Sequence, residues 1–132
     1  MRLLVDTQCW LWLSLTPDRL SLRARRLIED RSTILYLSTA SAWEITIKFG
    51  LGKLRLPEPP ATFVPSRLSS LGTQALAIEL SHVLRVAALP PHHRDPFDRL
   101  LVAQAQVEDL AILTSDPAIR AYDVDVMDAE RT

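Results

Sequence analysis

The stretch RLLVDTQCWLWLSL, residues 2–15, has the form of a strand that runs directly into a helix. Residues 2–6 are short, largely apolar and end on an acid, as a buried strand with a polar end does. Residues 7–15 are apolar on nearly every side, which is typical of a helix with little exposure to solvent. The sequence therefore predicts an opening strand–helix unit that carries Asp6 at the carboxyl end of the strand.

The alternation of strand and helix continues along the chain. Further strands are predicted over residues 32–38, 74–80, 110–116 and 124–127. Helices are predicted over residues 21–31, 39–50, 81–89 and 95–109. The proline-rich residues 54–65 are expected to be a loop or a helix entry, and residues 117–123 a helix or turn. This alternation favours an α/β fold, with a largely parallel sheet between helices and with ligands beyond the carboxyl ends of the strands.

The composition is that of an ordinary globular protein, with 48% hydrophobic and 23% charged residues, and we expect one domain over residues 1–132. The single cysteine, Cys9, excludes an internal disulfide and fits a reducing cytoplasm. The N-terminal apolar run is too short for a signal peptide, and no stretch approaches the ~20 apolar residues that span a bilayer. A net charge of -1 argues against a strongly basic surface overall.

Acids stand at or near four junctions between a strand or loop and the following helix, at Asp6, Glu44, Asp98 and Asp116. Taken singly, each acid is better explained as part of a helix cap. Asp6 can cap the helix after it, and Ser41 with Glu44 matches a capping box. Asp95 before Pro96 has the form of an N-cap, and Asp98 then complements the helix dipole.

Taken together, the four acids indicate a metal site. The junctions of a parallel sheet converge on one edge, and serine, threonine or asparagine would cap a helix as well as a carboxylate. Crowded carboxylates repel one another unless a cation neutralises them, and oxygen ligands suit Mg²⁺ or Mn²⁺. Such a site can activate water and stabilise the charge that builds up on a phosphate in hydrolysis. Thr114 and Ser115 offer hydroxyls beside it. His92 and His93 could also contribute to the site, but histidines on a proline-rich loop are more often exposed.

The acids lie in four stretches, which are LLVDTQCWLW, SAWEITIKFGLGKL, HRDPFDRLLVAQA and LTSDPAIRAY. In this order, the stretches resemble the PIN-domain family and, within it, the VapC-type toxins of bacterial toxin–antitoxin pairs. The resemblance extends from Met1 to about Val126. It implies an α/β/α sandwich, Mg²⁺- or Mn²⁺-dependent endoribonuclease activity on RNA, homodimerisation and inhibition by a cognate antitoxin protein.

Carried over residue by residue, the resemblance implies that the metal ligands and catalytic residues are Asp6, Glu44, Asp98 and Asp116. Thr114 is an expected auxiliary residue, and Asp95, although it belongs to the same DPFDR motif as Asp98, is expected only to cap its helix. Gln8 departs from the resemblance, because VapC-type toxins often have histidine there. We expect little effect on metal binding, since this position is not one of the acids.

The tryptophans are candidates for partner binding. Trp10 and Trp12 are two residues apart on a helix and point to different faces, so we expect one in the core and the other half exposed. The alternative is an apolar groove around Trp10, Trp12 and Leu13, with Arg23 at its rim, that receives an antitoxin segment. Trp43 is expected to pack behind the acidic site.

The basic residues near the expected site leave more than one function open. Lys48, Lys53 and Arg99 are candidate contacts to RNA phosphates, although the plainer explanation of the two lysines is that they are solvated. One alternative to the nuclease is a non-catalytic PIN-fold RNA-binding or scaffold module whose acids only cap. A weaker alternative is phosphoryl transfer through an aspartyl-phosphate, but no second acid closely follows Asp6 and no lysine ends a later strand. The presence of all four acids favours the nuclease.

Overall fold

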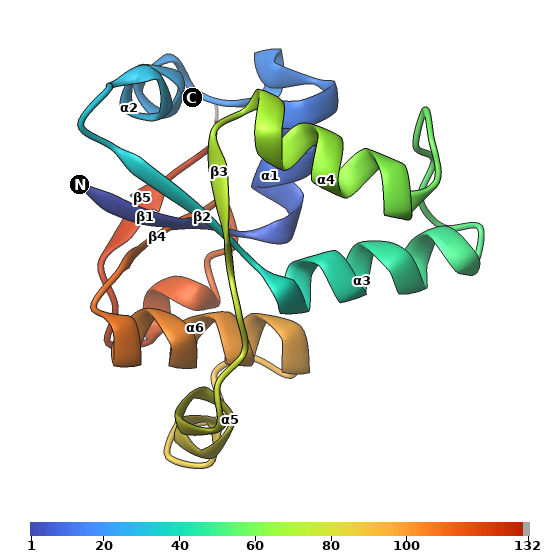
Figure 1. Cartoon of the computed structure of the whole chain (residues 1–132). Coiled ribbons are helices and arrows are strands. Elements are labelled where there is room, and N and C mark those ends of the chain that lie inside the picture. Colours follow the sequence, from blue (N-terminus) through green and yellow to red (C-terminus); the bar gives the residue numbers. More distant parts are fainter. Residues whose placement is uncertain (131–132) are drawn as a thin grey trace.

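Five strands form the central sheet of the computed structural model, which describes residues 1–130 (Figure 1). Their order is β3-β2-β1-β4-β5, and their bounds are β1 (Arg2–Val5), β2 (Ile34–Ser38), β3 (Thr73–Leu76), β4 (Ala111–Thr114) and β5 (Val126–Asp128). Every neighbouring pair of these strands is parallel. The chain builds outward from β1 first through β2 and β3 and then, on the other side, through β4 and β5. The direction of winding therefore reverses between β1 and β4, where α/β sheets typically bind ligands.

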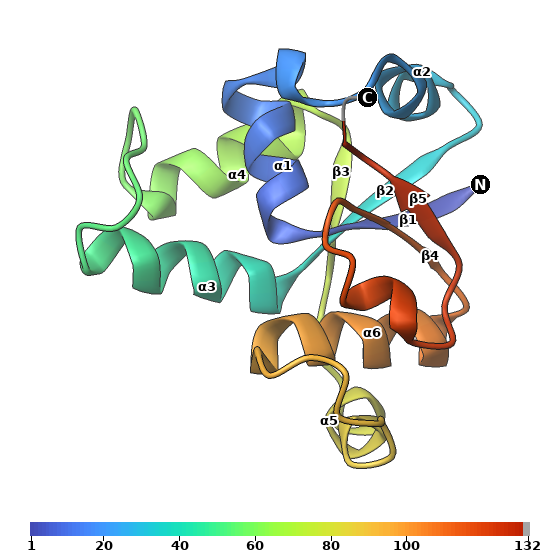
Figure 2. The same cartoon turned by 180° about the vertical axis from the view of Figure 1, so that it is seen from behind.

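Helices cover both faces of the sheet, as the two opposite views in Figures 1 and 2 show. The helices are α1 (Thr7–Leu15), α2 (Leu22–Glu29), α3 (Thr39–Gly50), α4 (Pro60–Ser70), α5 (Leu80–Val86) and α6 (Pro96–Glu108). One face carries α1, α2 and α4, and the other carries α6 with α5 outside it. Helix α3 leaves the carboxyl end of β2 and contacts both α1 and α6. Among the helices of residues 1–130, none combines the length and apolarity that crossing a membrane requires.

Strand β1 separates two hydrophobic cores. Leu3 and Val5 pack on the face that carries Trp10, whereas Leu4 packs on the opposite face with Leu101 of α6. Neighbouring side chains of a strand point to opposite faces, so an apolar run of this kind suits a strand covered on both sides. All three strand residues are fully buried, which holds the carboxyl end of β1 in the middle of the molecule.

The α/β/α sandwich predicted from the sequence is confirmed, while several boundaries differ. Of the two expectations for the proline-rich region, the helix entry is confirmed, because helix α4 begins there with Pro60 in its first turn, where a missing N–H does no harm. The strand predicted over residues 74–80 ends early, and α5 begins within that range at Leu80. The last two residues of the expected domain, 131–132, lie outside the described residues.

Candidate metal centre

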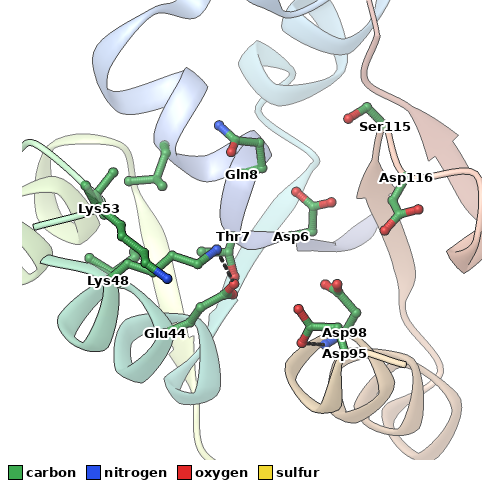
Figure 3. Close-up of a pocket in the computed structure, with 13 residues that line it drawn as sticks. Asp6, Thr7, Gln8, Glu44, Lys48, Lys53, Asp95, Asp98, Ser115 and Asp116 are labelled. Atoms are coloured by element: carbon green, nitrogen blue, oxygen red, sulfur yellow. Dashed lines mark hydrogen bonds and ion pairs between the residues drawn. The ribbon is translucent and has the colours of Figure 1, made fainter. Parts of the chain in front are cut away.

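All four predicted acids line one cavity of about 460 Å³ at the carboxyl ends of β1 and β4. They come from four elements: Asp6 follows β1, Glu44 lies in α3, Asp98 lies in the first turn of α6, and Asp116 follows β4. In Figure 3, Asp6, Asp98 and Asp116 face one another, and Glu44 lies across the cavity beside Lys48. Other polar residues that line the cavity are Thr7, Gln8, Lys53, Asp95 and Ser115. The fold thus gathers acids from distant parts of the sequence at one point.

Asp6 is both the N-cap of α1 and a buried acid of this cavity. Its Oδ1 accepts a hydrogen bond from the backbone N–H of Cys9 at 2.7 Å, and its Oδ2 accepts one from the hydroxyl of Thr114. Burial raises the pKa of Asp6 above its usual value, and the hydrogen bonds from Thr114 and Cys9 oppose that rise. Burial disfavours the charged form of Asp6, and the hydrogen bond from Thr114 stabilises that form.

Asp98 has a carboxyl whose pKa is raised to about 7. Burial is the main cause, because it disfavours the charged form, and the side chain is only 21% exposed. The negative charge of Asp95 adds to the rise, as do those of Glu44 and Asp6, while His93 opposes it. A nearby cation would favour the carboxylate, so this position is electrostatically suited to bind one.

Glu44 offers an oxygen that the described residues leave unsatisfied. Its side chain is 9% exposed, and its Oε2 pairs at 2.8 Å with the Nζ of Lys48, one helical turn further on. Its Oε1 is buried and has no hydrogen-bond partner within residues 1–130. A buried acceptor without a donor costs about 1–3 kcal/mol, and more when it is charged. A divalent cation would remove that cost, and a set of carboxylate oxygens is the one that Mg²⁺ and Mn²⁺ prefer.

The capping explanation is wrong for Glu44 and confirmed for Asp95. Helix α3 begins at Thr39 with Ser38 as its N-cap, so Ser41 and Glu44 do not form the predicted capping box. Asp95 caps α6 by accepting hydrogen bonds from two backbone N–H groups of the first turn, at 2.8 and 3.4 Å. Glu44 thus has no role in starting its helix that would explain a buried carboxylate.

His93 belongs to this site, a role that the sequence left open but ranked below exposure on a loop. Its Nε2 lies 2.7 Å from Oδ2 of Asp116 and 3.1 Å from Oδ2 of Asp98. Its side chain is only 16% exposed, so the expectation of an exposed loop histidine is wrong for His93, although it is confirmed for His92. The available signal was its position two residues before Asp95, because this spacing lets the ring accept the backbone N–H of the cap residue.

The tryptophans occupy different environments, as their spacing predicted. Trp10 is fully buried with its ring edge-on to Phe63, so its inclusion in an antitoxin-binding surface is wrong. Trp12 is partly buried, with the guanidinium of Arg19 4.8 Å from its ring centre. Trp43 is 61% exposed, so the expectation that it packs behind the site is also wrong. Of the three tryptophans, Trp12 and Trp43 are accessible to a partner.

Of the three candidate RNA contacts, only two lie at the cavity. Lys48 and Lys53 line the cavity, but Arg99 does not. The guanidinium of Arg99 donates to the hydroxyl of Tyr122 at 3.2 Å and, at 3.0–3.4 Å, to the carbonyl oxygens of Val86, Leu89 and Pro90. These bonds hold the loop before α6, so the guanidinium of Arg99 is not available as an RNA contact.

The chain belongs to the PIN-domain family, whose family model, described as PIN domain, matches residues 3–125. A curated relative, Ribonuclease VapC16 of Mycobacterium tuberculosis, is 45% identical over 58 residues, which are 44% of this chain and 41% of the relative. The chain therefore matches about two fifths of the length of that relative.

Solved structures share the fold at low sequence identity. The crystal structure of VapBC2 from Rickettsia felis bound to a DNA fragment from their promoter has a TM-score of 0.75 and 13% identity, covering 98% of this chain and 100% of that one. A toxin–antitoxin complex from Klebsiella pneumoniae has a TM-score of 0.66 and 16% identity, covering 98% of each chain. At these identities the likeness is one of fold, and it agrees with the parallel sheet and its helices.

Proposed function

We propose that this protein is a Mg²⁺- or Mn²⁺-dependent endoribonuclease that acts as the toxin of a toxin–antitoxin pair. The observation that carries the proposal is the buried Oε1 of Glu44, which has no hydrogen-bond partner within residues 1–130 and lies in a cavity lined by three other predicted acids. A non-catalytic scaffold has no need of such an oxygen, which is costly without a donor or a cation. Membership of the PIN-domain family and the identity to Ribonuclease VapC16 support cleavage of RNA in particular.

The proposed cation ligands are the carboxylates of Asp6, Glu44, Asp98 and Asp116. When bound, the ion supplies Lewis acidity toward an attacking water and toward the phosphate. The hydroxyl of Thr114 holds the carboxylate of Asp6 in place by donating to it. Two ligands, Asp6 and Asp116, follow adjacent strands that are fixed in register through Val5 and Leu113, so their separation is set by the sheet.

The basic side of the cavity is proposed to bind RNA phosphates through Lys48 and Lys53, which extend into it from the α3 side (Figure 3). The hydrogen bond to Glu44 is the main cause of the raised pKa of Lys48, which keeps the ammonium charged. In the described arrangement this ammonium neutralises Glu44. A cation on Glu44 would release the charge of Lys48 for a substrate phosphate.

A cognate antitoxin is the proposed inhibitor. Both structural relatives described above are toxin–antitoxin or VapBC complexes, which supports a partner of this kind. Because Trp10 is buried, the candidate antitoxin-binding surface consists of the partly buried Trp12 and Leu13, with the exposed Arg23 at its rim.

A homodimer is also proposed, with the apolar outer face of α5 as a candidate interface. The side chains of this face are 73%, 49% and 64% exposed at Leu80, Val83 and Leu84. We place the protein in the cytoplasm, where RNA is available and where the free thiol of Cys9 stays reduced.

The test is an RNA cleavage assay with the purified full chain in Mg²⁺, in Mn²⁺ and in EDTA. We expect cleavage with either ion and none in EDTA. Glu44→Gln keeps the shape of the side chain but removes its charge, so it should fold and lose more than about 100-fold in cleavage rate. Asp95→Asn is the matched control, because asparagine caps a helix as well as aspartate does. Cleavage that persists in EDTA, or a Glu44→Gln variant as fast as the parent, would show the proposal to be wrong.

A further inference from the structure

The ring of His93 bridges two of the proposed metal ligands that come from different elements. Its Nε2 is 2.7 Å from Asp116, after β4, and 3.1 Å from Asp98, in α6. The ligand-type atoms of the three side chains all lie within 4.8 Å of one another, a spacing that would also suit a metal ion. His93 is therefore either a nitrogen ligand of the cation or a hydrogen-bond donor to its oxygen ligands.

The other ring nitrogen decides between these roles. Nδ1 of His93 accepts a hydrogen bond from the backbone N–H of Asp95 at 3.0 Å. A backbone amide can only donate, so Nδ1 must present its lone pair, and the proton of the neutral ring is then on Nε2. An N–H nitrogen has no lone pair for a metal ion. In this arrangement Nε2 can only donate, and the acceptors within reach are the carboxylates of Asp98 and Asp116.

The loop that carries His93 is held in place by contacts on its other side. The backbone N–H of His93 donates to the hydroxyl of Tyr122 at 2.8 Å, and Arg99 donates to the same hydroxyl at 3.2 Å. Arg99 also binds the carbonyl of Pro90, within the same loop, at 3.0 Å. Because the backbone and Nδ1 are both bonded, the ring cannot turn Nε2 away without losing hydrogen bonds.

We propose that His93 is a positioning residue, whose Nε2–H holds the carboxylates of Asp98 and Asp116 together and leaves coordination of the cation to oxygen atoms. The inference rests on the proposed metal site and deepens it. The carboxylates of Asp98 and Asp116 have oxygens within 4.8 Å of each other and therefore repel, and the shared donor offsets that repulsion while no cation is bound. Oδ1 of Asp98 accepts no hydrogen bond within residues 1–130, so it stays available as a ligand. An all-oxygen set favours Mg²⁺ or Mn²⁺ over metals that prefer imidazole.

Mn²⁺ binding to the full chain tests the effect of this donor. His93→Ala removes it and should weaken Mn²⁺ binding roughly 10- to 100-fold, as the loss of a residue that orients metal ligands typically does. His93→Gln places an amide N–H at the same number of bonds from the backbone as Nε2, and should recover most of the lost affinity. His92→Phe is the matched control, since His92 is exposed and phenylalanine keeps its edge-on ring contact with Tyr122, so the affinity of this variant should equal that of the parent.

The position of the proton tests the geometry without any substitution. Correlation of ring nitrogens and protons by NMR on the ¹⁵N-histidine-labelled parent should show the proton of His93 on Nε2. That proton should stay in place when Mg²⁺ saturates the site. A proton on Nδ1, or loss of the Nε2 proton when Mg²⁺ binds, overturns the proposal.

The outcomes separate this inference from the proposed function. If the parent binds Mn²⁺ and His93→Ala binds it equally well, the positioning role is wrong and the metal site stands. If His93→Gln is as weak as His93→Ala, the imidazole itself is required and the donor role is wrong. If the parent binds no Mn²⁺, the metal site and the positioning role are both wrong.

Discussion

Replacing Asp98 with asparagine should stabilise the metal-free protein above neutral pH. The pKa of this carboxyl is about 7 in the fold, against an ordinary value of 3.8. A pKa that is higher in the folded chain than in the unfolded one means that the folded chain binds the proton more tightly. The resulting stability is fully present below about pH 4 and is lost as the pH rises through about 7. Asparagine carries no proton to lose, so the variant keeps this stability at every pH.

The size of the effect follows from the two pKa values, which differ by about 3. A difference of 1 corresponds to about 1.4 kcal/mol, so ionised Asp98 destabilises the fold by up to about 4 kcal/mol. Between pH 5 and pH 8 the parent should lose about 3 kcal/mol of unfolding free energy through this carboxyl. The raised pKa of Asp6 acts in the same direction. Mg²⁺ at 100 times its Kd should narrow the difference between parent and variant, since it stabilises the folded parent by about 2.7 kcal/mol.

Urea unfolding at pH 5 and pH 8, each in EDTA and in saturating Mg²⁺, measures these differences. Asp95→Asn is the control for removing a charge without removing a proposed ligand, and it should show a smaller change because Asp95 is only one of the causes that raise the pKa of Asp98. An Asp98→Asn variant less stable than the parent at pH 8 in EDTA would refute the reasoning. So would a metal-free parent that is equally stable at both pH values.

Four further substitutions test other parts of the structure. Thr114→Val removes the hydroxyl that donates to Asp6, so the pKa of Asp6 should rise further and Mg²⁺ affinity should fall in calorimetric titration at constant pH; equal affinity would contradict this. Trp10→Ala should lower the unfolding free energy by about 3–5 kcal/mol, because the ring is fully buried. Trp12→Ala should change the unfolding free energy less than Trp10→Ala does, but it should weaken antitoxin binding by about 2 kcal/mol. Unchanged binding would place the interface elsewhere. Leu84→Glu, on the exposed face of α5, should shift a homodimer toward monomers in sedimentation without loss of helix content, whereas an undisturbed dimer would exclude this face.

The order of strands and helices could be predicted because its signals are local. An apolar run that buries Leu3 and Val5 on one side and Leu4 on the other can be recognised without knowing what packs there. Helix α4 was predicted only as a helix entry, as an alternative to a loop, because its prolines argue against a helix interior. Pro65 nevertheless lies inside α4, next to Phe63 and Val64, both of which are buried. Burial of these neighbours is a tertiary effect, and residues 54–65 alone do not contain it.

The residues of the site also differ in how far their positions could be predicted from the sequence. Asp6 and Asp116 could be placed from chain order, since each lies within two residues of the end of a parallel strand. The bridging role of His93 could not, because it depends on a loop conformation held by Arg99 and Tyr122. Tyr122 lies 29 residues away in the sequence from His93, and no short spacing pattern connects the two.

Capping and metal binding turn out to be compatible uses of one carboxylate. Each carboxylate oxygen has two acceptor positions, and a hydrogen bond from a backbone N–H occupies one of them. Asp6 gives Oδ1 to the backbone N–H of Cys9, and Asp116 gives Oδ1 to that of Ala118 at 2.9 Å, so both retain acceptor capacity toward the cavity. Within residues 1–130, Glu44 and Asp98 accept no backbone hydrogen bond; Glu44 has the unsatisfied oxygen, and Asp98 has the pKa of about 7. The two acids without a backbone hydrogen bond in the described residues are therefore the ones that a cation would stabilise most, and substitution by an amide should separate structure from activity most clearly there.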